Sequence, residues 1–223
     1  MTVSRRRLRI AMENLGQHAT DIQHANLLER GNRLQRKIDA WCDIQHLYMP
    51  GVAAIRARVD KEGGGKALDA TTIELLLPSH VIDRVECDMK LSDFEWRLRY
   101  AQAHDALDDI QRLLVLHSRL YRSKERFSRG QYHNTRSVNI LNRVNSNINY
   151  GVKKYHQTRV LLQQLSKLLL KVGWEHQLKV LQDEDVRPLE EGEGSSVSEG
   201  RRVLSWIWRA QGVGSTKEAT QEG

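Results

Sequence analysis

Three carboxylates lie close together near the middle of the chain, and they are the first residues to consider for catalysis. Asp105, Asp108 and Asp109 are side chains of the type that holds metal ions for phosphoryl transfer. That chemistry needs carboxylates fixed around the ions by several elements, and no acid from a predicted strand accompanies this group. We therefore interpret the three aspartates as a solvated helix face and expect no catalytic residue in the chain.

Cysteine and histidine offer a second candidate, for metal binding. Cys42 and His46 are four residues apart on a predicted helix, which is the spacing of half a zinc site. No second pair has such a spacing, and Cys87 is isolated in the sequence. The glycines of 63–65 precede Lys66 without the spacing of a phosphate-binding loop, and no Ser/His/Asp or Cys/His triad can be assembled. We expect no metal, no cofactor and no small-molecule substrate, and hence a protein that is not an enzyme.

Charge is distributed unevenly along the chain, and this is its most informative feature. The stretch 119–171 holds twelve basic residues and a single acid, Glu125, which gives +11, whereas 183–199 holds seven acids and one arginine, which gives −6. The basic residues are Arg119, Arg122, Lys124, Arg126, Arg129, Arg136, Arg143, Lys153, Lys154, Arg159, Lys167 and Lys171.

Basic side chains in such a run can neutralise phosphates and release counterions, which favours contact with nucleic acid. Five asparagines between Asn139 and Asn149 add polar donors to the same stretch. The predicted DNA contacts are Arg122, Arg126, Arg129, Arg136, Arg143, Lys153 and Lys154. The alternative is a solvated helical face, masked by the acidic stretch of the same chain.

Two apolar stripes predict the helices that carry this basic stretch. Both stripes alternate steps of four and three residues, as in a coiled-coil seam. The first comprises Trp96, Tyr100, Ala103, Leu107, Ile110, Leu114, His117 and Tyr121, and the second comprises Leu141, Val144, Ile148, Gly151, Tyr155, Thr158, Leu162, Leu165 and Leu169. The second stripe is out of phase with the first, and Ser128, Gly130 and Asn134 between them favour a turn.

The fold class predicted is therefore all-α, with a long antiparallel helical hairpin, shorter helices and flexible tails. We expect the hairpin over about 92–171, with a capping box at Ser92 and Glu95 that starts its first helix. One very long bent helix is the alternative. Buried apolar seams favour the hairpin, because each seam can cover the other.

The remaining segments complete a helical domain over 21–186. Before the hairpin we expect a basic N-terminal arm over 1–20, a helix over about 21–48 and a linker over 50–70. After it we expect a short helix over 174–183, an acidic disordered linker over 187–200, an apolar segment over 201–209 that docks on the body, and a frayed tail over 210–223.

Composition narrows the location of the protein. No stretch reaches the roughly 20 apolar residues that span a bilayer, and Arg5, Arg6 and Arg7 are not followed by the apolar core of a secretory signal. Two cysteines cannot make a disulfide framework. We expect an intracellular protein of the nucleus or cytoplasm with no membrane contact.

Five sequence blocks occur in an order that resembles a known family. They are Leu47–Val52, Glu95–Leu107, Arg129–Arg136, Leu181–Val186 and Glu199–Trp208. Together, from about His18 to Gly214, they resemble the C-terminal region of the Kyakuja–Dileera–Zisupton (KDZ) transposases of basidiomycete fungi. The resemblance implies cut-and-paste DNA transposition by an RNase H-like domain with three metal-binding acids. In the family those acids lie upstream of the matched region, so none is assigned to a residue here.

The function that we expect is that of a non-catalytic C-terminal remnant of a transposase-like protein, truncated at both ends. It would contact DNA weakly and without sequence preference through its basic helical face. The alternative is a helical interaction module that self-associates as a homo-oligomer through leftover seam surface and has no role with nucleic acid.

Overall fold

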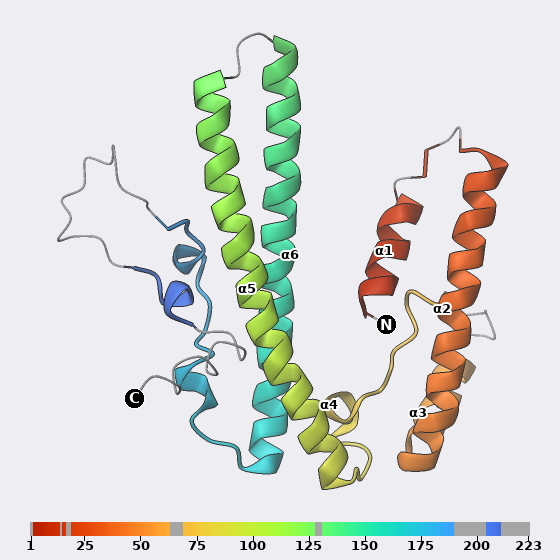
Figure 1. The fold of residues 1–223 in the computed structure, drawn as a ribbon. Helices are drawn as coiled ribbons and strands as arrows, with labels where there is room; N and C mark the ends of the chain where they lie inside the picture. The colour runs from red at the N-terminus through yellow and green to blue at the C-terminus, as the bar shows by residue number, and fades with distance from the viewer. Residues whose placement is uncertain are drawn as a thin grey trace, which may run out of the picture. The chain divides into compact units, whose positions relative to one another are not determined.

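The chain forms helices joined by turns and extended segments. The structure, a computed structural model, describes residues 2–13, 15–16, 19–62, 69–127, 131–189 and 204–210. These residues form six α-helices and three short 3-10 turns, and they contain no strand (Figure 1). The chain divides into two units, residues 1–92 and 93–223, and each is described by itself. The all-α prediction is confirmed.

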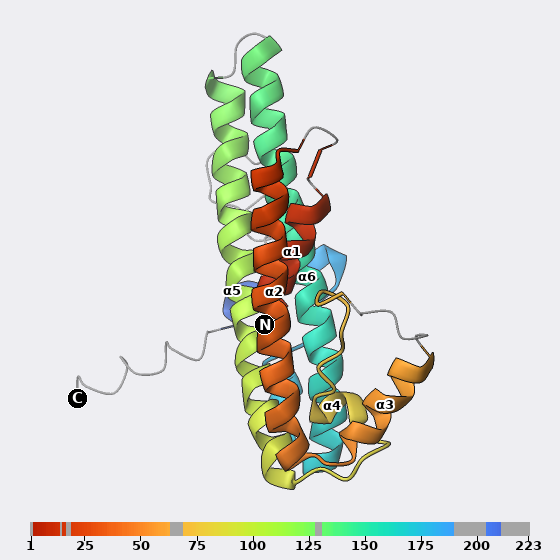
Figure 2. The ribbon, with the colours of Figure 1, turned by 90° about the vertical axis from the view of Figure 1, so that its right-hand side faces the viewer.

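The second unit is built on the predicted antiparallel hairpin. Its helices are α5 (Met89–Phe127) and α6 (Gln131–Leu169), each of 39 residues, and they run side by side in both views (Figures 1 and 2). Most residues of the two predicted stripes are buried between them. The fully buried ones include Ala103, Leu107, Ile110, Tyr155, Leu162 and Leu165. The first stripe fails at its far end, because Tyr121 is 48% exposed.

Two contacts fix the register of the hairpin. Gly151 lies so close to α5 that a Cβ atom there would stand 2.8 Å from Cγ1 of Ile110. Nearer the other end, the indole nitrogen of Trp96 donates to the hydroxyl of Ser166 at 2.8 Å. A close apolar approach and a directional polar bond together define one alignment of the two seams.

The expected capping box at Ser92 is wrong, because α5 begins one turn earlier at Met89. The carboxylate of Asp88 accepts from the backbone nitrogen of Lys90 at 2.8 Å and caps the helix there. Ser92 is fully buried, and its hydroxyl has no hydrogen-bond partner among the described residues. Glu95 accepts from Nε of Arg99 at 3.1 Å instead.

The predicted short helix over 174–183 is also wrong. In its place are two 3-10 turns, η1 (Trp174–His176) and η2 (Asp183–Asp185), with non-helical chain between them. The hydroxyl of Tyr155 donates to the carbonyl of Lys179 at 2.6 Å, and Nε of Arg159 donates to that of Leu178 at 3.1 Å. These carbonyls bond to side chains of α6, and the segment is held against the hairpin.

The apolar segment docks as predicted in its described part, 204–210. Ile207, in the 3-10 turn η4 (Trp206–Arg209), is fully buried in the core of the hairpin. The hydroxyl of Ser205 donates to the carbonyl of Asp185 at 2.9 Å, and the indole of Trp208 donates to that of Arg187 at 3.1 Å. The linker and the tail expected on either side lie almost wholly outside the described residues.

The first unit contains α1 (Thr2–Glu13), α2 (Asp21–Tyr48), α3 (Val52–Glu62) and α4 (Pro78–Val81). Helix α2 confirms the predicted helix and is capped by Thr20, whose hydroxyl accepts from Gln23 at 3.3 Å.

Two expectations for this unit are corrected. The basic arm over 1–20 contains α1, because the buried Leu8 packs with Leu34 and Ile38 of α2. The linker over 50–70 contains α3, because Ala53 and Ala54 favour a helix and the buried Val52 packs in an apolar cluster.

Candidate nucleic-acid interface

The antiparallel fold gathers the basic residues nearest the turn at one end of the hairpin. Arg119, Arg122, Lys124 and Arg126 lie on the last turns of α5, and Arg136 and Arg143 lie on the first turns of α6. These two helix ends are neighbours in the antiparallel hairpin, so the six cations share one end of the unit, where Glu125 is the single acid among the described residues. Arg129 lies outside the described residues. We call this group the distal basic cluster.

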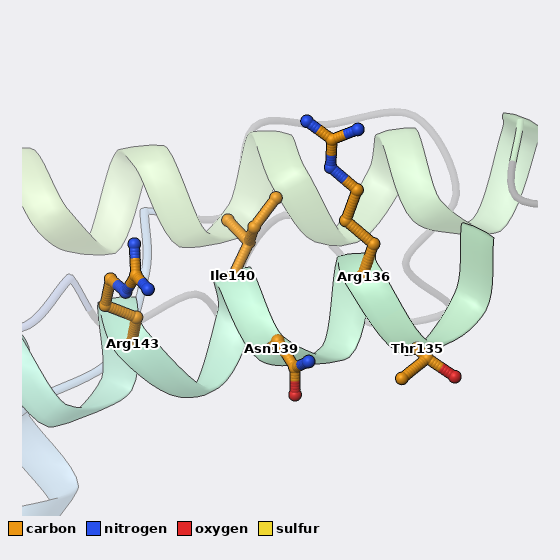
Figure 3. A pocket seen from close by; sticks show the side chains of 5 residues that line it. All are labelled: Thr135, Arg136, Asn139, Ile140 and Arg143. Carbon is orange, nitrogen blue, oxygen red and sulfur yellow. The ribbon is translucent and has the colours of Figure 1, made fainter. Parts of the chain in front are cut away.

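Arg136 and Arg143 are the members of the distal basic cluster that line a depression on α6. Both are exposed, seven residues apart on α6, and line a shallow depression with Thr135, Asn139 and Ile140 (Figure 3). Neither arginine forms an ion pair with a described acid. Their charge is therefore available to an anionic partner.

Lys153 and Lys154 are not part of the distal basic cluster. They follow Gly151, which packs against Ile110 on α5. A Cβ atom added at Gly151 would also stand 3.9 Å from the carbonyl oxygen of Ala106. Both lysines therefore lie near the level of the acids at 105–109 on α5. The sequence grouped them with the arginines because they are close along the chain, but the hairpin separates them.

Two more basic residues of the stretch have structural roles. The guanidinium of Arg159 lies 5.5 Å from the ring centroid of Trp174, besides its bond to Leu178. The ammonium of Lys171 pairs with Asp93 at 2.9 Å and lies 5.3 Å from the ring centroid of Trp96. The hydrogen bond from Lys171 lowers the pKa of the Asp93 carboxyl below its usual value. Arg159 thus contacts the segment that follows α6, and Lys171 contacts the start of α5.

The carboxylates considered for catalysis do not converge on a metal position. Asp105 and Asp109 are exposed on one face of α5, and no described group of three or more His, Cys, Asp or Glu residues could hold an ion. In the first unit, burial is the main cause of the raised pKa of the Cys42 thiol, while His46 is exposed. This thiol is therefore less readily ionised than an ordinary one, which disfavours it as a metal ligand.

Sequence reasoning missed part of the surface around the distal basic cluster. Thr135 and Ile140 line the same depression as the two arginines, although neither had been singled out. The available signal was the spacing of Thr135, Asn139 and Asn142, which repeats the four-three steps of the buried seam on the other side of α6.

Comparison with known proteins assigns neither a family nor a function to the chain. No protein-family model matches the chain, and no match was found among curated proteins or solved structures. Among the described helices, none is long and apolar enough to cross a membrane.

Proposed function

We propose that this protein is a non-enzymatic helical module that contacts double-stranded DNA through the distal basic cluster. One observation carries the proposal: in the part of the chain that the structure describes, six cations from two helices share one end of the hairpin with one acid. Phosphates along a duplex attract such a group, and the contact releases counterions without reading sequence. The resemblance to the C-terminal region of KDZ transposases agrees with a DNA-associated role, and under it the chemistry would belong to another part of such a protein.

Salt dependence tests the proposal directly. If about four phosphates are neutralised, the logarithm of the association constant for a duplex should fall against the logarithm of salt concentration with a slope of about −3.6. Reversing Arg136 and Arg143 to glutamate should remove about two of these phosphate contacts and flatten the slope to about −1.8. Fluorescence anisotropy of a labelled duplex between about 50 and 200 mM salt gives the measurement.

A matched control is present in the first unit. Arg30 and Lys37 are also exposed, also seven residues apart, and also on a long helix. Reversing them changes the net charge by the same amount and should leave the slope as it is. If both double variants weaken binding equally, net charge rather than the distal basic cluster attracts DNA.

The unmodified protein should also leave a supercoiled plasmid intact with magnesium, because we assign it no catalytic acids.

Self-association is the second candidate function, and exposed apolar residues favour it. Phe94 and Leu98 are four residues apart on α5, and their side chains are 59% and 72% exposed. Such a pair on one helix face can pack against a second copy. Light scattering on the protein and on Leu98→Lys separates the candidates, since a dimer lost in the variant would favour this one.

A further inference from the structure

A stripe of uncharged polar residues follows the outer face of α6. Its members are Thr135, Asn139, Asn142, Ser146 and Asn149, all exposed and spaced by alternating steps of four and three. Ser146 is two residues from both Val144 and Ile148, which is about 200° around a helix in either direction. Val144 and Ile148 belong to the buried seam, so the stripe lies on the side of α6 opposite the hairpin core. We call it the asparagine stripe.

Asparagine is a poor residue for the interior of a helix, because its side chain competes for backbone hydrogen bonds. Among the described residues, no hydrogen bond occupies the side-chain amides of Asn139, Asn142 and Asn149. Within the stripe, the hydroxyl of Ser146 donates to the backbone carbonyl of Asn142 at 3.0 Å, and this bond does not involve an asparagine amide. Local stability therefore does not explain why amides recur at these positions.

Charge near the asparagine stripe points to the class of partner. Helix α6 contains no aspartate or glutamate in its 39 residues. Arg136 and Arg143 flank the stripe, and Figure 3 shows Thr135 and Asn139 on one side of the helix and Arg136 on the other, with Ile140 between the two arginines along α6. Arginine pairs with guanine, asparagine pairs with adenine, and apolar groups contact the thymine methyl in the major groove. The asparagine stripe thus carries side chains of the type that reads adenine, and arginines lie beside it on the same helix.

We propose that the first turns of α6 enter the major groove of DNA and that Asn139 and Asn142 read base edges there. This inference rests on the proposed function and adds sequence selectivity to it. The segment from Thr135 to Ser146 is about 16 Å long at 1.5 Å per residue, which corresponds to about five base pairs. A single helix fits the groove, whose width is about 12 Å, and the stripe projects away from α5.

Selection from a duplex library with ten randomised base pairs tests the proposal. The full chain should enrich a motif of about five base pairs that contains adenine. It should bind the enriched duplex at least about tenfold more tightly than a scrambled one, since a single bidentate pair accounts for that factor. The variant Asn139→Ala/Asn142→Ala should reduce this ratio to about one and keep the salt slope of the unmodified protein.

The variant is not expected to unfold the helix, because alanine is the better helix former. Asn26→Ala/Asn32→Ala, two exposed positions on α2, makes the same exchange away from the stripe and should preserve the enrichment.

Three results would overturn the inference, and they can be told apart. Salt-dependent binding without any enriched motif removes base reading but leaves the proposed function intact. Loss of binding to every duplex removes both. Unchanged selection by Asn139→Ala/Asn142→Ala, together with a changed molecular mass in light scattering, would make the asparagine stripe a protein contact.

Discussion

Replacing Gly151 by alanine places two effects of known size in opposition. In a helix, alanine is favoured over glycine by about 1 kcal/mol. The added Cβ atom would stand 2.8 Å from Cγ1 of Ile110, which is 0.6 Å short of the 3.4 Å at which ordinary contact begins. Cγ1 is close to the backbone, and Ile110 is fully buried, so the clash cannot be relieved by moving the end of a flexible side chain.

Overpacking of this kind costs about 1–3 kcal/mol, so the clash should win. We expect Gly151→Ala to lower the free energy of unfolding by about 1 kcal/mol, as a net of the two terms. Urea denaturation followed by tryptophan fluorescence measures this, because four of the five tryptophans lie in the second unit.

Two further variants isolate the cause. Gly31→Ala on α2 meets no atom within 4 Å, so it should stabilise the first unit by up to about 1 kcal/mol through propensity alone. In an Ile110→Ala background the clash disappears, and Gly151→Ala should then become stabilising. If Gly151→Ala stabilises the protein with Ile110 intact, the close approach that sets the register is wrong.

Two other predictions concern the same core. Ile148 is 6% exposed, so Ile148→Asp should cost at least about 3 kcal/mol through an unpaired buried charge and lost packing; an unchanged melting temperature would place this residue on the surface. His104 is 4% exposed, and burial lowers its pKa although Asp108 and Asp105 oppose the shift. The unfolded chain therefore binds a proton at His104 more readily than the folded chain does. The free energy of unfolding keeps its full contribution from neutral His104 above about pH 6.5 and loses it as the pH falls towards the folded pKa. Urea titrations at pH 7.5 and 5.5 should show a larger loss for the protein than for His104→Phe, and equal losses would contradict the shift.

The hairpin could be predicted because it depends on local periodicity. Residues such as Leu107 and Ile148 repeat at seam spacing, and burial of one seam requires the other. The distal basic cluster followed in part, since the turn predicted near Gly130 places Arg126 and Arg136 at the same end of the hairpin.

Contacts between distant residues could not be predicted in this way. Arg159 resembled its basic neighbours until the structure placed it on Trp174 and the carbonyl of Leu178. The spacing of Trp174, Leu178 and Leu181 suits a helix, but side chains of α6 hold that backbone in another conformation. The start of α5 was missed although its cap is local, because Asp88 accepts from the backbone of Lys90 two residues further on. The burial of Ser92, by contrast, depends on packing in three dimensions.

The order in which the core is completed has a consequence for synthesis. Leu178, Leu181 and Ile207 fill one side of the hairpin core, and all three emerge from the ribosome after both long helices. Until Trp206 and Ile207 arrive, part of the core around Tyr155 lacks its cover, because the Tyr155 ring lies 6.2 Å from that of Trp206. Transiently exposed hydrophobic surface of this kind makes a chain prone to aggregation. A stop codon between residues 189 and 204 would thus leave the helices formed and that surface uncovered. Such a truncation should reduce yield through aggregation while helical content stays nearly the same.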